Sequence, residues 1–188
     1  MSASEARSEA EPSEDQRESE GRSEAKPSEE RRRSEGRTGP LLTPELLANI
    51  GKRAPPDAQI VTRRDIRKYA IASGQTQRRY LGGDVAPPLF HVALFWPVVP
   101  RDELTTDGVG RDKLLPKFPL ERAMAGGLDI EYHGEMRPGD EVVATRTLTN
   151  IYEKAGRSGP LIFYEIVMEV RRKSGELLVT EKTTRILR

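Results

Sequence analysis

The clearest pattern in the chain is an alternation of apolar and polar residues in its second half. Between residues 161 and 171 one set of positions is apolar (Ile162, Tyr164, Ile166, Met168 and Val170), while Glu165, Glu169 and Arg171 fall on the other face. Alternation with a period of two is typical of a β-strand that buries one face. Extended segments are predicted at 128–132, 141–152, 161–171 and 177–187, separated by turn residues at 137–140, 156–160 and 174–175. The pattern predicts an antiparallel meander.

Two helix starts precede these strands. Thr43-Pro44-Glu45 combines an N-cap residue, a proline at the first helical position and an acidic first turn, which predicts a short helix. Thr62 and Asp65 form a second start signal, and the apolar residues within 66–71 have helical spacing before Gly74. This second helix is expected to pack on the sheet. Helices followed by long antiparallel strands predict an α+β fold.

The first 40 residues differ from the rest in composition. They repeat Ser-Glu pairs, mix both charges and contain no aromatic or branched aliphatic residue. Such a segment has no apolar side chains to bury, so it cannot offset the conformational entropy lost on folding. We therefore expect a disordered tail at 1–40 and one folded domain at 41–188. A tether or docking role around Arg31-Arg32-Arg33 is the functional alternative for the tail.

Composition excludes several classes of protein. The chain has no cysteine, so it has no disulfide framework, thiolate metal site or cysteine nucleophile. The longest largely apolar stretch, 87–99, is interrupted by His91 and Pro97 and is shorter than the roughly 20 residues that span a bilayer. The first residues also lack the apolar core of a secretory signal. We expect a cytoplasmic protein that does not enter the membrane.

Charge is unevenly distributed along the sequence. Eight Lys/Arg against eleven Asp/Glu give residues 1–40 a net charge of −3, which leaves +4 for residues 41–188. A mildly basic body is compatible with an acidic ligand such as coenzyme A. It is not the strongly clustered basic stripe of a nucleic-acid binder, so DNA and RNA are not expected as partners.

The order of short motifs resembles one enzyme family. Residues 61–74 resemble the opening helix of MaoC-like (R)-specific enoyl-CoA hydratases. The motifs that follow resemble the N-terminal, fatty-acid-synthase-type dehydratase-like half of mesaconyl- and itaconyl-type CoA hydratases; they are Asp84–His91, Asp107-Gly108, Glu121–Gly127, Arg137–Asp140, Lys154–Leu161 and Thr184–Arg188. The resemblance covers Leu41 to Arg188. It implies a single hot-dog fold, in which an antiparallel sheet wraps around a central helix.

The catalytic motif of that family is altered here. It typically resembles Ser-Gly-Asp-x-Asn-Pro-Ile/Leu-His, whereas this chain has Ser73-Gly-Gln-Thr-Gln-Arg-Arg-Tyr80. Neither the amide of Gln75 nor the hydroxyl of Tyr80 is a good general base near neutral pH, so we predict no catalytic residue. In long family members a second hot-dog domain follows and carries the active site. The sequence ends where that domain would begin, so we expect the missing half either to come from elsewhere or to be dispensable.

The resemblance implies a non-catalytic hot-dog subunit of a heteromeric enoyl-CoA hydratase or 3-hydroxyacyl-thioester dehydratase. Such a subunit would shape the acyl-CoA channel for a catalytic MaoC-like partner, within a dimer or tetramer of hot-dog domains. The substrate would be a thioester of coenzyme A or acyl carrier protein, with no cofactor and no metal. Two alternatives stay open. One is a stand-alone hydratase or dehydratase with a divergent site that uses Tyr80, Asp84 or His91, and the other is a homodimeric acyl-CoA-binding or regulatory protein.

Four residues are candidates for substrate contact: Arg78, Tyr80, His91 and Trp96. Arg78 and its neighbour Arg79 can bind an anionic group of coenzyme A or a partner carboxylate. His91 and Trp96 belong to an aromatic-rich segment that suits the lining of an acyl tunnel. Simpler interpretations are a solvated arginine, a hydrogen-bonded core histidine and a core or interface tryptophan. Gly126-Gly127 is expected to permit close backbone approach where helix and sheet meet.

Overall fold

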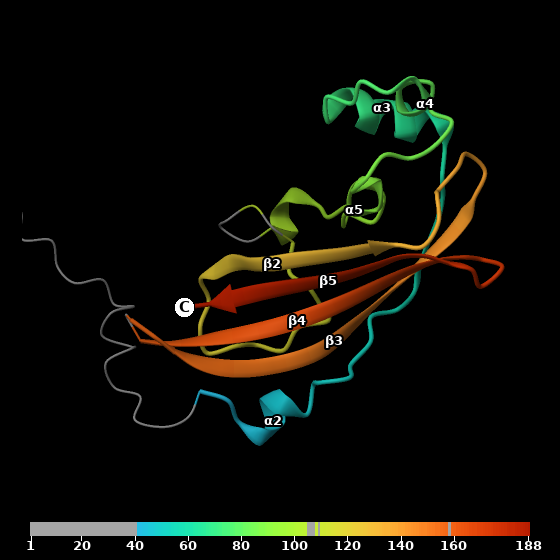
Figure 1. Cartoon of the computed structure of the whole chain (residues 1–188). Helices are drawn as coiled ribbons and strands as arrows, with labels where there is room; N and C mark the ends of the chain where they lie inside the picture. Colours follow the sequence, from blue (N-terminus) through green and yellow to red (C-terminus); the bar gives the residue numbers. More distant parts are fainter. Residues whose placement is uncertain (1–40, 105–107, 109, 158) are drawn as a thin grey trace, which may run out of the picture. The chain divides into compact units, whose positions relative to one another are not determined.

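The computed structural model describes residues 41–104, 108, 110–157 and 159–188, so the predicted tail at 1–40 lies outside the described residues. The described part contains one antiparallel sheet in the strand order β1-β3-β4-β5-β2 (Figure 1). The strands are β1 (Asp57–Ile60), β2 (Ala123–Tyr132), β3 (Glu141–Gly156), β4 (Gly159–Arg172) and β5 (Leu177–Leu187). With the helices that precede them, these strands confirm the α+β class.

The predicted meander is confirmed for β3, β4 and β5, which follow one another in both sequence and space. β2 does not join β3, its neighbour along the chain. It crosses to the far side and pairs with β5, where Ile130 lies opposite Glu181. The four-residue β1 was not predicted, because its sequence Asp-Ala-Gln-Ile is too short to show a period; it pairs with the start of β3. β1 and β2 are therefore the two edges of the sheet.

The core lies on one face of this sheet. The alternation in β4 is confirmed, since Ile162, Tyr164, Ile166, Met168 and Val170 are all buried. Two apolar clusters share the face. One contains Val142 and Val170 together with Phe90, and the other contains Leu148 and Ile162 together with Leu114.

The helices begin where the capping signals predict. α2 (Pro44–Leu47) is capped by Thr43, whose side-chain oxygen accepts the N–H of Leu46 at 3.3 Å. α3 (Arg63–Ala72) is capped by Thr62, whose Oγ1 accepts the N–H of Asp65 at 3.1 Å and donates to its carboxylate at 2.6 Å. Thr62 and Asp65 thus bind each other twice at the start of the helix, once through the backbone N–H of Asp65 and once through its carboxylate. Two short α-helices and a 3-10 turn follow: α4 (Arg78–Leu81), α5 (Phe90–Leu94) and η1 (Arg101–Glu103).

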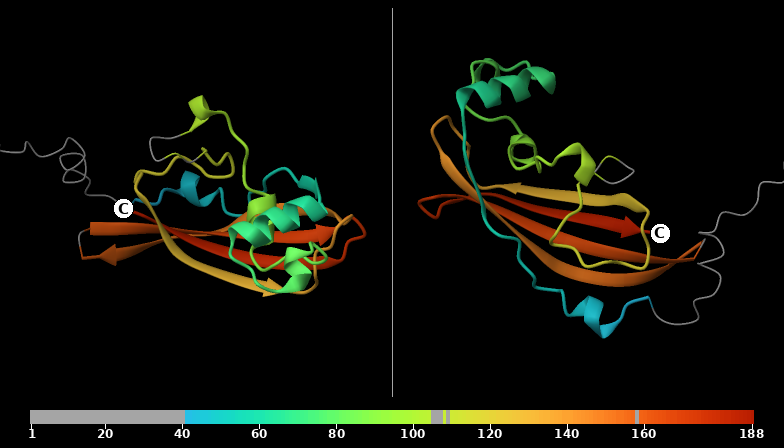
Figure 2. Two further views of the ribbon diagram at one scale, coloured as in Figure 1. Left: turned by 90° about the horizontal axis from the view of Figure 1, so that it is seen from above. Right: turned by 180° about the vertical axis from the view of Figure 1, so that it is seen from behind.

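The helix next to the sheet is α5, which has five residues. α3 and α4 lie outside α5 on the same side of the sheet (Figures 1 and 2). The expectation that 62–74 packs directly on the sheet is therefore only partly met. α3 contacts α4 and α5, and it reaches the sheet's core cluster through Ile66. No helix in the described part of the chain is long and apolar enough to cross a membrane.

Gly126 and Gly127 lie inside β2 and not before it, which corrects the predicted start of this strand. The register of β2 against β5 shifts between Ala125 and Gly127. A Cβ on Gly126 would lie 2.9 Å from Ile186 Cγ1 on β5. The glycine thus permits a close approach between two strands at a bulge, where the sequence had suggested a junction of helix and sheet.

Candidate functional site

A cavity of about 170 Å³ lies between the helical segments and one end of the sheet. Its walls come from α4, residues 85–88, the start of α5, and the chain that leaves β2. The lining includes Tyr80, Phe90, His91, Tyr132, Glu135 and Met136. Pockets that enclose a whole small-molecule ligand usually measure about 300–1,000 Å³. The cavity of this chain can therefore hold part of an acyl group, but not a complete acyl thioester.

A buried hydrogen-bonded pair lies at one wall of this cavity, which His91 lines. His91 on α5 is 1% exposed, and its Nε2 lies 2.8 Å from Oε2 of Glu181 on β5. Because a carboxylate only accepts, Nε2 carries the proton and donates. The hydroxyl of Thr183 donates to the second oxygen of Glu181 at 2.9 Å. The arrangement connects the helix to the sheet and fixes the orientation of the imidazole ring.

The pKa of Glu181 lies below its ordinary value of 4.5. Burial raises the pKa of this carboxyl, but the hydrogen bonds from His91 and Thr183 and the charge of Arg146 lower it further than burial raises it. Glu181 is therefore ionised at neutral pH. It can orient His91 by accepting its hydrogen bond, but it is not a general acid.

The start of α5 is held in an unusual conformation. Leu89 has φ 65°, in the left-handed region that a branched side chain rarely adopts. Its N–H donates to the hydroxyl of Tyr132 at 3.0 Å, and the Tyr132 ring contacts His91 edge-on. The N–H of Phe90 donates to Pro87 O, and that of Val92 donates to Leu89 O. These three N–H groups are thus already engaged within the chain.

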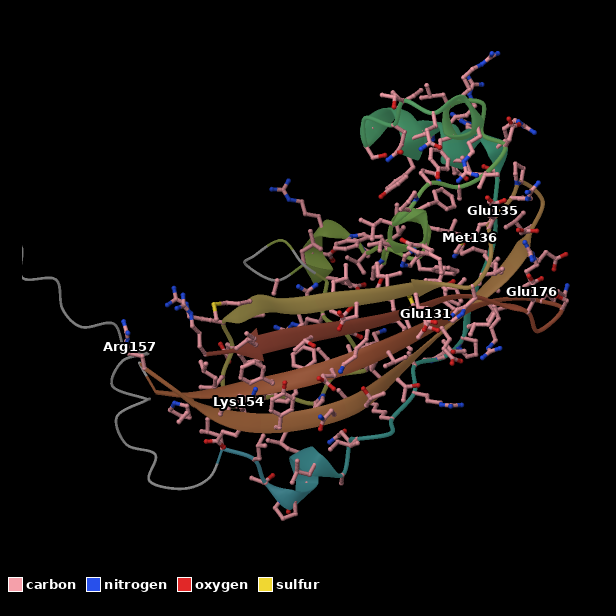
Figure 3. The ribbon with its side chains drawn as sticks, in the orientation of Figure 1. Glu131, Glu135, Met136, Lys154, Arg157 and Glu176 are labelled. Atoms are coloured by element: carbon pink, nitrogen blue, oxygen red, sulfur yellow. The ribbon has the colours of Figure 1, made fainter. Side chains whose placement is uncertain are left out.

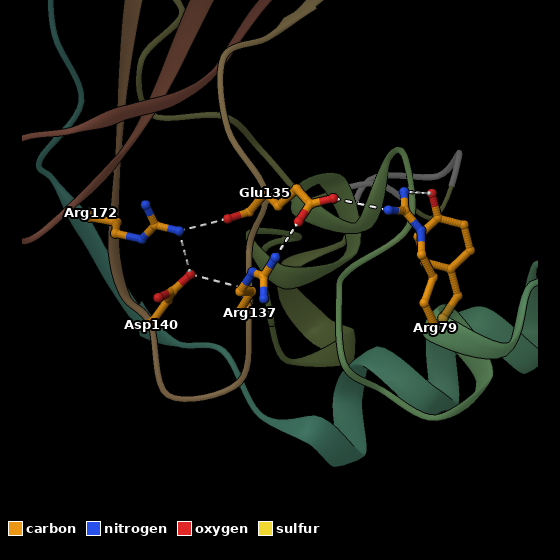
Figure 4. A network of polar contacts seen from close by, with 6 residues as sticks. Arg79, Glu135, Arg137, Asp140 and Arg172 are labelled. Atoms are coloured by element: carbon orange, nitrogen blue, oxygen red, sulfur yellow. Dashed lines mark hydrogen bonds and ion pairs between the residues drawn. The ribbon is translucent and has the colours of Figure 1, made fainter.

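An arginine network forms the rim of the cavity (Figure 4). Arg79 Nη2 donates to the Tyr80 hydroxyl at 2.7 Å, and Nη1 donates to Glu135 at 3.0 Å. Arg137 donates to the other oxygen of Glu135 at 2.7 Å. The hydrogen bond from Arg137, with the help of Arg79, lowers the pKa of Glu135. The Tyr80 hydroxyl is therefore bound to a cation, next to a carboxylate that stays ionised.

The same network continues behind the rim. Arg172 donates to the carbonyl of Glu135 at 2.7 Å and to Asp140 at 3.1 Å. Asp140 also accepts the N–H of Arg137 at 2.8 Å, which closes the turn between β2 and β3. This end of the sheet, with Glu135 and Met136, lies opposite the hairpin tip that carries Lys154 and Arg157 (Figure 3). The network fixes the shape of the cavity rim through the backbone of residues 135–140.

The structure brings together two of the four predicted substrate contacts. Tyr80 and His91 both line the cavity, whereas Arg78 is exposed and does not line it, and Trp96 is 62% exposed. Sequence reasoning missed Glu181, Tyr132 and Glu135. Glu181 had a detectable signal, because it occupies an inward position between the buried Val179 and Leu187 of β5. Within the described ranges, no group of three His, Asp or Glu side chains is placed to hold a metal ion.

A family model described as "FAS1-like, dehydratase domain region" matches residues 48–181. The chain belongs to this dehydratase family. The match confirms the MaoC-like resemblance and the hot-dog fold.

Two relatives show how the chain compares with longer and shorter proteins. It is 34% identical over 106 residues to mesaconyl-C(4)-CoA hydratase of Chloroflexus aurantiacus, over 54% of this chain and 38% of that protein. It is 28% identical over 142 residues to a UPF0336 protein of Streptomyces griseus, over 74% of this chain and 92% of that protein. The chain thus spans well under half of the hydratase and nearly all of the second relative.

The fold is similar to that in the ChsH1-ChsH2 complex from Mycobacterium tuberculosis. The TM-score is 0.54 at 16% identity, over 76% of this chain and 91% of that chain. At this identity the likeness concerns the fold alone. Some solved hot-dog structures of this kind are thus complexes of two different chains.

Proposed function

We propose that this chain is the non-catalytic hot-dog subunit of a heteromeric hydratase or dehydratase that acts on acyl thioesters. One observation carries the proposal: in residues 73–80, where the family motif places its acid and base, no side chain is available to transfer a proton. Gln75 is an amide whose nitrogen lies 3.5 Å from Ser73 Oγ, and the Tyr80 hydroxyl accepts a hydrogen bond from Arg79. Both groups are already hydrogen-bonded within the chain.

The start of α5 supports the same proposal. Stabilising the enolate-like oxygen of a thioester requires backbone N–H groups that point at the substrate. The N–H groups of Leu89, Phe90 and Val92 donate to Tyr132 and to backbone carbonyls of this chain. These three groups cannot donate to a substrate oxygen without breaking these contacts. A partner chain would supply the acid/base pair.

The free edge of the sheet supports a partner. β2 pairs with β5 on one side, and within the described residues no strand lies on its other side. Nearly every residue of this ten-residue strand is exposed, including Leu128 at 50% and Tyr132 at 49%. A long apolar edge strand offers unpaired N–H and C=O groups that another strand can bind. The partner's sheet would then continue at β2, next to the cavity that Tyr132 lines.

A second candidate function rests on the His91–Glu181 pair. A histidine oriented by an ionised carboxylate at a cavity wall is the arrangement of a general base, as in an active hydratase with a divergent site. The chain would then act without a partner. The burial of His91 at 1% exposure favours the non-catalytic proposal, because little of the ring is accessible to a substrate.

The test is an assay of crotonyl-CoA hydration, in which the loss of ultraviolet absorbance of the conjugated thioester measures turnover. The chain is assayed alone, and then co-expressed with a MaoC-like single-domain protein that has an intact Asp-x-Asn-Pro-x-His motif. We expect turnover only in the pair. Turnover by the lone chain that disappears in His91→Gln would replace the proposal with the second candidate. Tight acyl-CoA binding by a homodimer, with no turnover in either preparation, would favour a binding or regulatory protein.

A further inference from the structure

The positive charge of the folded region is concentrated in one short segment. Residues 61–84 contain six Lys/Arg and two Asp/Glu, for a net charge of +4, and the rest of residues 41–188 is neutral. This segment comprises α3, α4 and the turns that follow them. The net positive charge of residues 41–188 therefore lies entirely within residues 61–84.

The exposed face of α3 carries most of this charge. Arg64, Arg67 and Lys68 are exposed, and none of them has a carboxylate of the described residues within 4 Å. Arg63, on the same helix, is different because it pairs with Asp84 and Gly82 O. On the sheet side, basic residues commonly have acidic partners, as in Arg172–Asp140, Lys173–Glu141 and Lys182–Glu165. We call Arg64, Arg67, Lys68 and Ile71 the α3 face.

These charges oppose the stability of the helix that carries them. Arg64 lies three residues from Arg67 and four from Lys68, so like charges are neighbours on the helix surface. Arg64 also lies in the first turn, where the helix dipole favours acidic residues. Folding alone does not explain why these charges gather on the α3 face, because they do not stabilise the helix. Binding to an anionic partner does.

Resting on the proposed function, we propose that the α3 face docks the acidic surface of the carrier protein that delivers the acyl thioester. Ile71 is 66% exposed among the cations, and an apolar residue ringed by charges is typical of protein docking. The hollow between these side chains is lined by Arg63, Arg64, Arg67, Lys68 and Ile71 alone. It has no aromatic ring to stack on an adenine, which argues against the nucleotide end of coenzyme A as the occupant.

The opposite face of α3 leads to the cavity. Tyr69 packs edge-on against Phe90, with ring centroids 5.8 Å apart, and Phe90 lines the cavity wall. α4, which contacts α3, supplies Tyr80 to the same cavity. A carrier docked on α3 would therefore place its acyl group beside the cavity.

The experiment measures binding of crotonyl-acyl carrier protein to the full-length chain by calorimetric titration. We expect Arg64→Glu/Arg67→Glu to weaken binding at least about tenfold at low salt. Lys117→Glu/Arg157→Glu makes the same change in total charge at two exposed positions away from α3, and it should weaken binding by less than about twofold. Circular dichroism checks that both variants are folded.

Three results would overturn the proposal: equal weakening by both double variants, no binding of the carrier to the native chain, or an equal weakening of free coenzyme A binding by Arg64→Glu/Arg67→Glu. The last result would assign the α3 face to a small phosphate-bearing ligand. Turnover of crotonyl-pantetheine, which lacks a carrier protein, by the chain and its partner tests the proposed function separately. Turnover there together with unchanged carrier affinity in the α3 variant would reject only the docking surface.

Discussion

At the scale of single residues, the polar groups buried beneath α5 are arranged to satisfy one another. His91 donates to Glu181, and Glu181 also accepts from Thr183, so both of its oxygens are bound. A buried carboxylate that lost such partners would retain its desolvation cost. The pair therefore ties α5 to β5 whether or not it takes part in chemistry.

Replacing the carboxylate of Glu181 tests how much its hydrogen bond with His91 contributes to stability. Glu181→Gln should lower the free energy of unfolding at pH 7 by about 1–3 kcal/mol, because a charged hydrogen bond is exchanged for a weaker neutral one. Urea unfolding followed by circular dichroism measures the difference. Glu121→Gln removes an exposed carboxylate and should change the free energy by less than about 0.5 kcal/mol.

The same variant should respond less to acid. The folded-state pKa of Glu181 is lowered from 4.5, so its contribution to stability is complete above that value and is lost as the pH falls through the lowered folded value. The native chain should lose more stability between neutral pH and acid than Glu181→Gln does. Equal losses in repeated urea titrations across this range would show that Glu181 is not a source of the acid dependence.

Gly83 is a second position where a single atom matters. It has φ 75°, and an added Cβ would lie 2.8 Å from Arg63 O and from the side-chain stems of Arg63 and Arg67. Gly83→Ala should cost about 2–3 kcal/mol, from backbone strain together with steric overlap. Gly51→Ala is the control, since Gly51 has φ 90° and open space around it, so it should cost only about 1 kcal/mol. Thermal unfolding of the two variants separates strain from overlap.

At the scale of elements, the like-charge neighbours and the basic first turn of α3 lower the stability of this helix. Arg64→Glu removes two like-charge neighbours and places an acidic residue in the first turn, so it should raise the free energy of unfolding by about 0.5–1 kcal/mol. Arg157→Glu, at the tip of the β3–β4 hairpin, should leave stability nearly unchanged. A loss of stability in Arg64→Glu would mean that Arg64 makes a structural contact. The charges of the α3 face would then be explained by folding, and they would no longer support a docking surface for the carrier protein.

The long strands and capped helices could be predicted because their signals are local. Alternation in β4 and the Thr62–Asp65 exchange depend only on residues a few positions apart. β1 and α5 are too short to show a period, and the N-cap residue of α5, Leu89, has a conformation that leucine seldom adopts. The candidate site was harder to predict, because the partners His91 and Glu181 lie 90 residues apart and meet only when β5 and α5 are in place.

At the scale of the whole molecule, the described chain leaves its functional surfaces incomplete. The cavity is too small for an acyl thioester, and β2 leaves one edge of the sheet open. The pairing of β2 with β5 places Tyr132, which lines the cavity, on this open edge strand. A second sheet that joined at β2 would extend both the sheet and the wall of the cavity.

Substitutions on the two edges can decide which one binds the partner. Leu128→Lys places a charge on β2, and we expect it to abolish co-purification with the MaoC-like partner and the crotonyl-CoA turnover that depends on the pair. Leu128 is 50% exposed, so the variant should lose less than about 1 kcal/mol of its own stability. Ile60→Lys makes the same change on β1, where Ile60 is 62% exposed, and should leave the pair intact. Size-exclusion chromatography with light scattering reports the mass of each complex. A pair that survives Leu128→Lys but dissociates in Ile60→Lys would move the interface to β1, on the far side of the sheet from β2, and the cavity would then have to bind its acyl group without help from the partner.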